Sequence, residues 1–98
     1  MQAKKLTLDT EKKSVLIAAL SEAASTMSTD MRKIYDNTTA QVKHATDRIL
    51  LTKAQVEIVK FALQHHRAKH GDNLNVRTML DQLVLTRTEF TAKYANVA

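Results

Sequence analysis

The stretch LQHHRAKHGDN, residues 63–73, places three histidines, an arginine and a lysine directly before the only glycine of the chain. His66 and His70 are one helical turn apart, so both imidazoles could bind one metal ion if a third ligand joined them. Spacing supplies no such ligand, because His65 points to another face and His44 lies in a different segment. The glutamate that follows the first histidine of an HExxH motif is also missing. We therefore predict no metal site.

The same stretch has the composition of a helix C-terminus. Arg67, Lys69 and His70 fall in the expected last turn, where a positive charge interacts favourably with the helix dipole, by roughly 0.3–1 kcal/mol per exposed group. Gly71 can then adopt the left-handed conformation that other residues resist. We predict that this stretch ends a helix, and that Arg67 and Lys69 could also contact a phosphate backbone.

A second segment with functional character is MLDQLVLTRTEFTAKYA, residues 79–95. It resembles a helix-turn-helix, with a first helix, a turn from Val84 to Thr86, and a second helix from Arg87. Thr86 stands three residues before Glu89, which is the spacing of a capping box and predicts a helix start. The resemblance implies that the second helix enters the major groove of DNA, where arginine pairs well with guanine. The side chains presented there would be Arg87, Thr88, Thr91 and Lys93.

Two positions depart from the helix-turn-helix pattern. Val84 stands where the turn usually has glycine, and Lys93 stands where an apolar side chain normally packs on the first helix. The rival interpretation is one amphipathic helix over residues 76–95, whose apolar row is interrupted only by the charge of Arg87. Whether the segment breaks at Thr86 is left open between these two interpretations.

The frame that positions these side chains is expected to be helical. The chain has no proline and one glycine in 98 residues, which disfavours hairpins and tight loops. A chain of this length should form one domain. We predict an all-α domain over residues 1–98, in which 1–50 is a dimerisation or helical-bundle segment and 51–98 is a helix-turn-helix-like core.

A central core helix is expected from Thr52 to His70. Thr52 and Gln55 have capping-box spacing at its start, and Phe61 is expected to face the core. Asn75 is placed to cap the helix that follows. The predicted buried face comprises Val56, Ile58, Val59, Phe61, Ala62, Leu63 and His66.

The N-terminal half carries a thin stripe of small and apolar residues at steps of three and four, from Leu16 to Ile49. Two clusters of capping residues interrupt it, STMSTD at 25–30 and DNTT at 36–39. In the second, Thr38 has capping-box spacing and could restart a helix. One long helix over residues 10–50 and a bent pair both remain open. A stripe this thin needs a partner, so we expect a homodimer or a chain folded back into a bundle.

Charge and composition limit the possible locations and partners. Fifteen Lys and Arg against ten Asp and Glu give a net charge of +5, which favours acidic partners, nucleic acid first among them. Cysteine is absent, which excludes disulfides and thiolate zinc sites. The longest apolar run, residues 15–20, is far shorter than the ~20 residues that span a bilayer. We expect a cytoplasmic protein that does not enter the membrane.

Catalysis and single-stranded RNA binding have little support. The sequence shows no glycine-rich phosphate loop, no nucleophile pattern and no convincing pair of carboxylates in an apolar pocket. Its aromatic residues are Tyr35, Phe61, Phe90 and Tyr94, which are too few for stacking platforms if Phe61 and Phe90 lie in the core. We expect a protein that is not an enzyme and uses no cofactor and no small-molecule substrate.

Two candidate functions are consistent with these observations. In the first, the protein is a small DNA-binding regulator of transcription that is dimeric through its N-terminal half. In the second, it is a helical inhibitor, adaptor or anti-repressor that covers a protein partner with a surface including Met27 and Met31, since methionine adapts to varied surfaces. DNA ranks first because a positive net charge predicts it directly. The predicted DNA contacts are Arg67, Lys69, Arg87, Thr88, Thr91 and Lys93.

Overall fold

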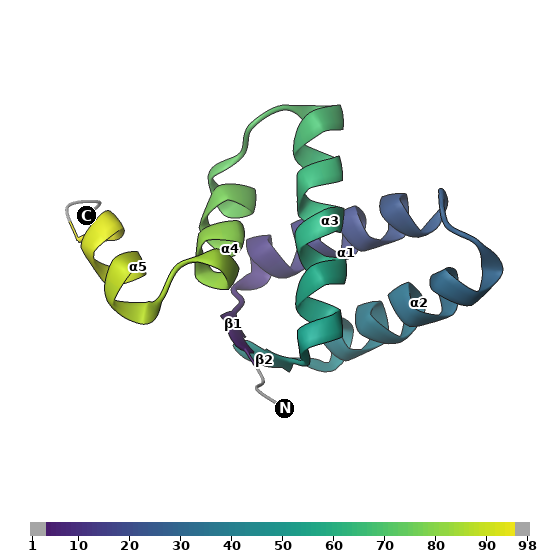
Figure 1. The fold of residues 1–98 in the computed structure, drawn as a ribbon, viewed down its shortest axis with the longest axis horizontal. Helices are drawn as coiled ribbons and strands as arrows, with labels where there is room; N and C mark the ends of the chain where they lie inside the picture. Colours follow the sequence, from purple (N-terminus) through teal and green to yellow (C-terminus); the bar gives the residue numbers. More distant parts are fainter. Residues whose placement is uncertain (1–3, 96–98) are drawn as a thin grey trace.

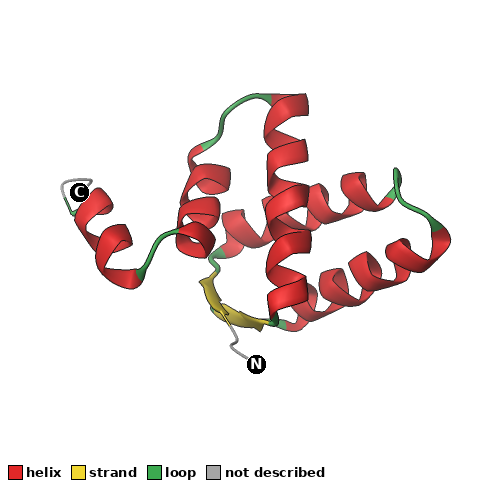
Figure 2. Ribbon diagram, in the orientation of Figure 1, coloured by secondary structure: helices red, strands yellow, loops and turns green. Residues whose placement is uncertain are grey.

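The computed structural model describes residues 4–95, which form five helices and two short strands. In chain order these are β1 (Lys4–Thr7), α1 (Thr10–Ala24), α2 (Thr29–His44), β2 (Arg48–Leu51), α3 (Lys53–His70), α4 (Leu74–Val84) and α5 (Arg87–Tyr94). α1 and α2 fold back on each other, α3 crosses α1, and α5 projects away from the body (Figures 1 and 2). The fold is mostly helical, as predicted, but it is not purely all-α.

β1 and β2 are the elements that the sequence did not predict. They pair antiparallel, with Leu6 opposite Ile49. Leu6 and Leu51 are buried, whereas Lys5 and Leu50 are exposed, so each strand alternates between the core and solvent. Four residues are too few for this alternation to stand out, and strands joined through two helices need no turn glycine. The purely all-α prediction and the helix as far as residue 50 are therefore wrong.

The N-terminal half is a pair of helices, which is one of the two alternatives that the sequence left open. α1 ends at Ala24, and Ser28 caps α2 by accepting the backbone N–H of Met31. The break thus falls within the STMSTD cluster, and α1 and α2 pack against each other. Part of the thin stripe is covered within the chain, and a homodimer stays a prediction.

The second cluster of capping residues does not start a helix. Thr38 and Thr39 lie buried inside α2, where their hydroxyls donate hydrogen bonds to the carbonyls of Ile34 and Tyr35, one turn earlier. Threonine can satisfy its hydroxyl in this way within a helix, so capping residues alone do not fix a boundary. The predicted restart at Thr38 is wrong.

α3 begins and ends where the central helix was predicted. Thr52 and Gln55 form the reciprocal capping box at its start. Phe61, however, is 44% exposed, because it lies roughly 200° around the helix from both Val59 and Leu63. Its placement in the core was therefore wrong. The buried face of α3 consists of Ile58, Val59, Ala62 and Leu63.

Gly71 ends α3 with φ of 89° and ψ of 175°. The positive φ agrees with the choice of glycine, but the predicted left-handed conformation is wrong, because this ψ lies far from the left-handed helical value of about 47°. The backbone is instead in a region that essentially only glycine uses. α4 then starts earlier than expected, because Asn73 rather than Asn75 caps it by accepting the N–H groups of Asn75 and Val76.

Replacing Gly71 with alanine should lower the free energy of unfolding by about 1–3 kcal/mol through backbone strain. An added Cβ would meet no atom within 4 Å, so crowding contributes nothing. Gly71→Asn should be destabilised as well, because asparagine tolerates the left-handed helical region but not the region found here. Urea denaturation of both variants measures the effect, and an asparagine variant as stable as wild type would contradict it.

One apolar core joins the sheet to α1, α2, α3 and α4. α5 contributes no buried side chain to it, so the core ends with α4. Among residues 4–95, no helix combines the length and apolarity that crossing a membrane requires. The largest fully buried side chains are Leu6, Leu16, Leu20, Leu51, Leu63, Met79, Val42, Val59, Val76 and Thr38.

Candidate functional site

The C-terminal segment breaks at Thr86 into two helices, α4 and α5. Thr86 caps α5 by accepting the backbone N–H of Glu89, and the Glu89 carboxylate accepts the N–H of Thr86. This reciprocal capping box stabilises the start of α5. The interpretation as one continuous helix over residues 76–95 is therefore wrong, while a DNA-reading helix-turn-helix stays a prediction.

Asp81 on α4 contacts two side chains of α5. The hydroxyl of Tyr94 donates to its Oδ2 at 2.6 Å, and the ammonium of Lys93 lies 2.8 Å from the same oxygen. The rings of Phe90 and Tyr94 also pack together, with centroids 4.7 Å apart. An ion pair and a hydrogen bond to Asp81 therefore join the last turn of α5 to α4.

Acid should weaken this attachment. Burial by itself raises the pKa of Asp81, but hydrogen bonds from Lys93 and Tyr94 outweigh it and hold that pKa below its usual value of 3.8. The stabilisation is therefore complete above the pKa of the unfolded chain, and it is lost as pH falls through the lower pKa of the folded state. The NMR signals of the Tyr94 ring should shift below about pH 4. Asp81→Asn should remove this step, and a step that persists in the variant would contradict the assignment.

A basic groove lies between α5 and the N-terminal part of the chain. Its volume is about 580 Å³, and it is lined by residues of β1, α1, α4 and α5 and by the turn before α5. Four lining residues are cations, namely Lys4, Lys5, Lys12 and Arg87, and none is a carboxylate. The groove therefore concentrates positive charge on a concave surface, which attracts anions.

The four cations differ in whether they already contact a polar group of the protein. Lys12 pairs with Asp9 at 3.0 Å, and the ammonium of Lys4 donates to the carbonyl of Leu85 at 3.3 Å. Lys5 and Arg87 are exposed, and within the described part of the chain neither forms an ion pair. Lys5 and Arg87 are thus the cations best able to contact a ligand.

The structure brings together only some of the predicted DNA contacts. Arg87 and Thr91 line the groove, and Thr88 is exposed on the same helix. Arg67 and Lys69 lie at the end of α3 that is remote from the sheet (Figure 1). They do not extend the groove, and the ammonium of Lys69 lies 3.4 Å from a carboxylate oxygen of α1.

The lysines of the groove were missed from the sequence. Lys4, Lys5 and Lys12 lie near the N-terminus, whereas Arg87 lies near the C-terminus, and the packing of β1 and α1 against α4 brings them together. The backbone N–H of Thr7 helps to fix this packing by donating to the side chain of Gln82 at 2.8 Å. The paired lysines at the start of β1 were the one available signal.

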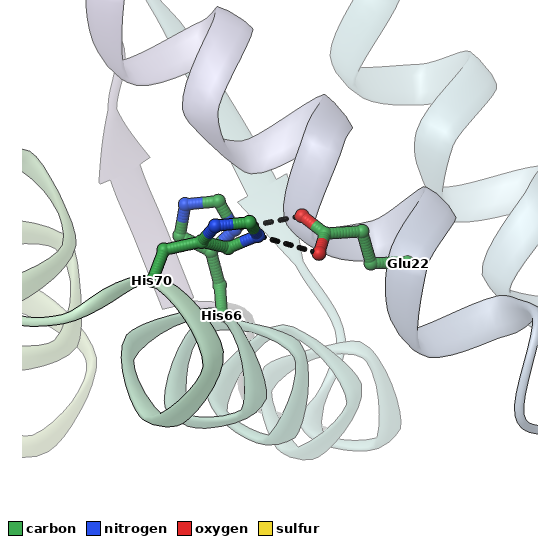
Figure 3. Close-up of side chains that lie close together, drawn as sticks. All are labelled: Glu22, His66 and His70. Atoms are coloured by element: carbon green, nitrogen blue, oxygen red, sulfur yellow. Dashed lines mark hydrogen bonds and ion pairs between the residues drawn. The ribbon is translucent and has the colours of Figure 1, made fainter.

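A second cluster joins α1 to the histidine-rich end of α3. One carboxylate oxygen of Glu22 lies 3.0 Å from His66 Nδ1, and the other lies 2.7 Å from His70 Nε2 (Figure 3). The hydrogen bond from His70 is the main cause that lowers the pKa of Glu22 to about 2; burial opposes it and His66 adds to it. Glu22 is the third partner that spacing along the sequence could not supply.

Comparison with protein-family models, curated proteins and solved structures gives no match to this chain. The chemistry of the groove and of the Glu22 cluster is therefore the basis for assigning a function.

Proposed function

We propose that this protein binds DNA through the basic groove between β1 and α5. The observation that carries the proposal is the lining of that groove, which holds four cations and no carboxylate. Cations that contact phosphates release condensed counterions, and this release favours binding. The net charge of +5 also attracts the negatively charged DNA from longer distances.

The residues of the groove have different expected roles. Lys5 and Arg87 contact phosphates, because both are exposed and without an ion-pair partner among residues 4–95. Thr91, which lines the groove, and the exposed Thr88 next to Arg87 are expected to contact the DNA backbone or base edges. Lys93 is held by Asp81, so it contributes through the field of the protein rather than through a direct contact.

Binding of a mixed-sequence duplex across a salt series tests the function. The logarithm of the binding constant should fall linearly with the logarithm of salt concentration, by about 0.9 for each phosphate contacted. Fluorescence anisotropy with a labelled duplex measures this slope. No binding at about 50 mM salt contradicts the proposal, and clearly tighter binding of single-stranded RNA would assign the groove to RNA instead.

A dimeric regulator of transcription is the specific form of this function that we propose. Two copies related by a twofold axis would offer two grooves to a palindromic site, as dimeric DNA-binding proteins do. The exposed side chains of Met31 and Ile34 on α2 offer apolar area for such contact, at 40% and 42% exposure. Light scattering coupled to size-exclusion chromatography should give twice the 11.0 kDa mass of the chain, and a monomer at micromolar concentration would exclude the dimer.

The second candidate function is the covering of a protein partner without catalysis. The same exposed Met31 and Ile34 favour it, because an adaptable apolar surface suits protein recognition. Affinity capture and DNA binding of the wild-type protein separate the two functions. Recovery of one stoichiometric protein partner with no DNA binding at moderate salt supports the partner-binding module, whereas DNA binding with no protein partner supports the groove.

A further inference from the structure

We propose that Glu22, His66 and His70 form a binding site for a divalent transition-metal ion, with Zn²⁺ the first choice. α1 provides the carboxylate, and the last turns of α3 provide both imidazoles (Figure 3). The site is separate from the basic groove, so it does not depend on DNA binding.

The donor atoms are already gathered. The nearest donors of Glu22, His66 and His70 all lie within 4.8 Å of one another. Around a zinc ion with bonds of about 2.0–2.1 Å, tetrahedral donors are roughly 3.3 Å apart. The two carboxylate-to-nitrogen distances, 3.0 Å to His66 and 2.7 Å to His70, run to different oxygens of Glu22, and they need to lengthen by roughly 0.3 Å and 0.6 Å. The three donor atoms lie within 4.8 Å of one another, so rotations of the Glu22, His66 and His70 side chains are the movements that would complete a tetrahedral arrangement.

The donor types select the class of ion. Two imidazole nitrogens and one carboxylate, without thiolate, suit Zn²⁺, Ni²⁺, Cu²⁺ and Co²⁺ better than Mg²⁺ or Ca²⁺, which prefer all-oxygen sites. The spacing of His66 and His70 places both rings on one face of α3, with centroids 4.5 Å apart. Three protein ligands leave at least one position for water.

Solvent reaches the cluster from one side. The side chains of Glu22 and His66 are 23% and 15% exposed, whereas that of His70 is 48% exposed. An ion can therefore enter past His70 and be shielded on the side of α1. Within the described residues, no hydrogen bond orients the second ring nitrogen of either histidine, so we expect an affinity on the order of micromolar rather than that of a fully supported structural site.

Lys69 provides an internal competitor and a useful control. Its ammonium lies 3.4 Å from the same Glu22 oxygen that faces His70. A metal ion bound to that oxygen would displace the ammonium and be repelled by it. Removing the charge at Lys69 should thus leave metal binding intact or make it tighter, whereas removing any of the three ligands should weaken it.

Calorimetric titration of the tag-free protein with Zn²⁺ tests the site. Binding should be one to one, and a hundredfold excess of free Zn²⁺ over Kd should raise Tm by about 10 °C. Glu22→Gln, His66→Gln and His70→Gln should each weaken binding roughly tenfold or more. His44→Gln, which removes an exposed histidine of α2, and Lys69→Gln should not weaken it.

A second measurement does not depend on the variants being folded. Addition of Zn²⁺ to wild type should shift the imidazole NMR signals of His66 and His70 and leave those of His44 and His65 in place. Equal shifts at all four histidines would show adventitious binding, and an unchanged spectrum with millimolar Zn²⁺ would show that the cluster is an ion pair only. Either result overturns the metal site and leaves the DNA-binding proposal standing.

Discussion

A double variant with Lys5→Gln and Arg87→Gln should bind duplex DNA roughly tenfold more weakly than wild type at low salt, which corresponds to ~0.7 kcal/mol for each cation. Lys5 lies near the N-terminus and Arg87 near the C-terminus, but both side chains line the groove, and both are exposed. If each contacts one phosphate, the salt slope should also fall by about 1.8. Fluorescence anisotropy across a salt series gives both quantities.

The matched control removes the same charge from another surface. Lys33→Gln with Lys43→Gln takes two exposed lysines from α2, which does not line the groove. This control should change affinity much less and leave the slope nearly unaltered. Equal losses in the two double variants would mean that DNA responds only to net charge. An unchanged affinity in the groove variant would place the interface elsewhere.

Truncation of Leu63 to alanine should lower the free energy of unfolding by about 2–5 kcal/mol. Leu63 is fully buried on α3, and the loss combines the transfer free energy of the removed atoms with the cavity that remains. Because small domains are stable by only about 5–15 kcal/mol, the variant should be close to unfolding at physiological temperature. Urea denaturation followed by circular dichroism measures the change.

Ile34→Ala is the control for this truncation. Ile34 is 42% exposed on α2, so its loss should lower stability by less than about 1 kcal/mol. A Leu63 variant that loses no more stability than the Ile34 variant would contradict the central place of α3 in the core.

The features that the sequence predicted are local ones. The capping boxes at Thr52 and Thr86 are present as expected, because each depends on residues only three positions apart. The end of α3 at Gly71 was also predictable, because a single glycine permits a positive φ. The mostly helical structure was predictable because the chain has one glycine and no proline.

The features that were missed depend on distant contacts. The pairing of β1 with β2 and the groove between Lys5 and Arg87 both join segments that are far apart in the chain. Glu22 gives no sign in the sequence that it will face His66 and His70. A helical pattern identifies which residues share a face, but not which other helix that face will meet.

The pairing of β1 with β2 also has a kinetic consequence. The two strands are separated in the chain by α1 and α2, so closing the sheet fixes a long loop, at an entropic cost that later contacts must offset. We expect the helical pair to form early and β1 to dock late. Substitutions in β1 should then mainly accelerate unfolding rather than slow folding. Because Lys4 and Lys5 belong to β1, the groove would be among the last surfaces to form and among the first to be lost.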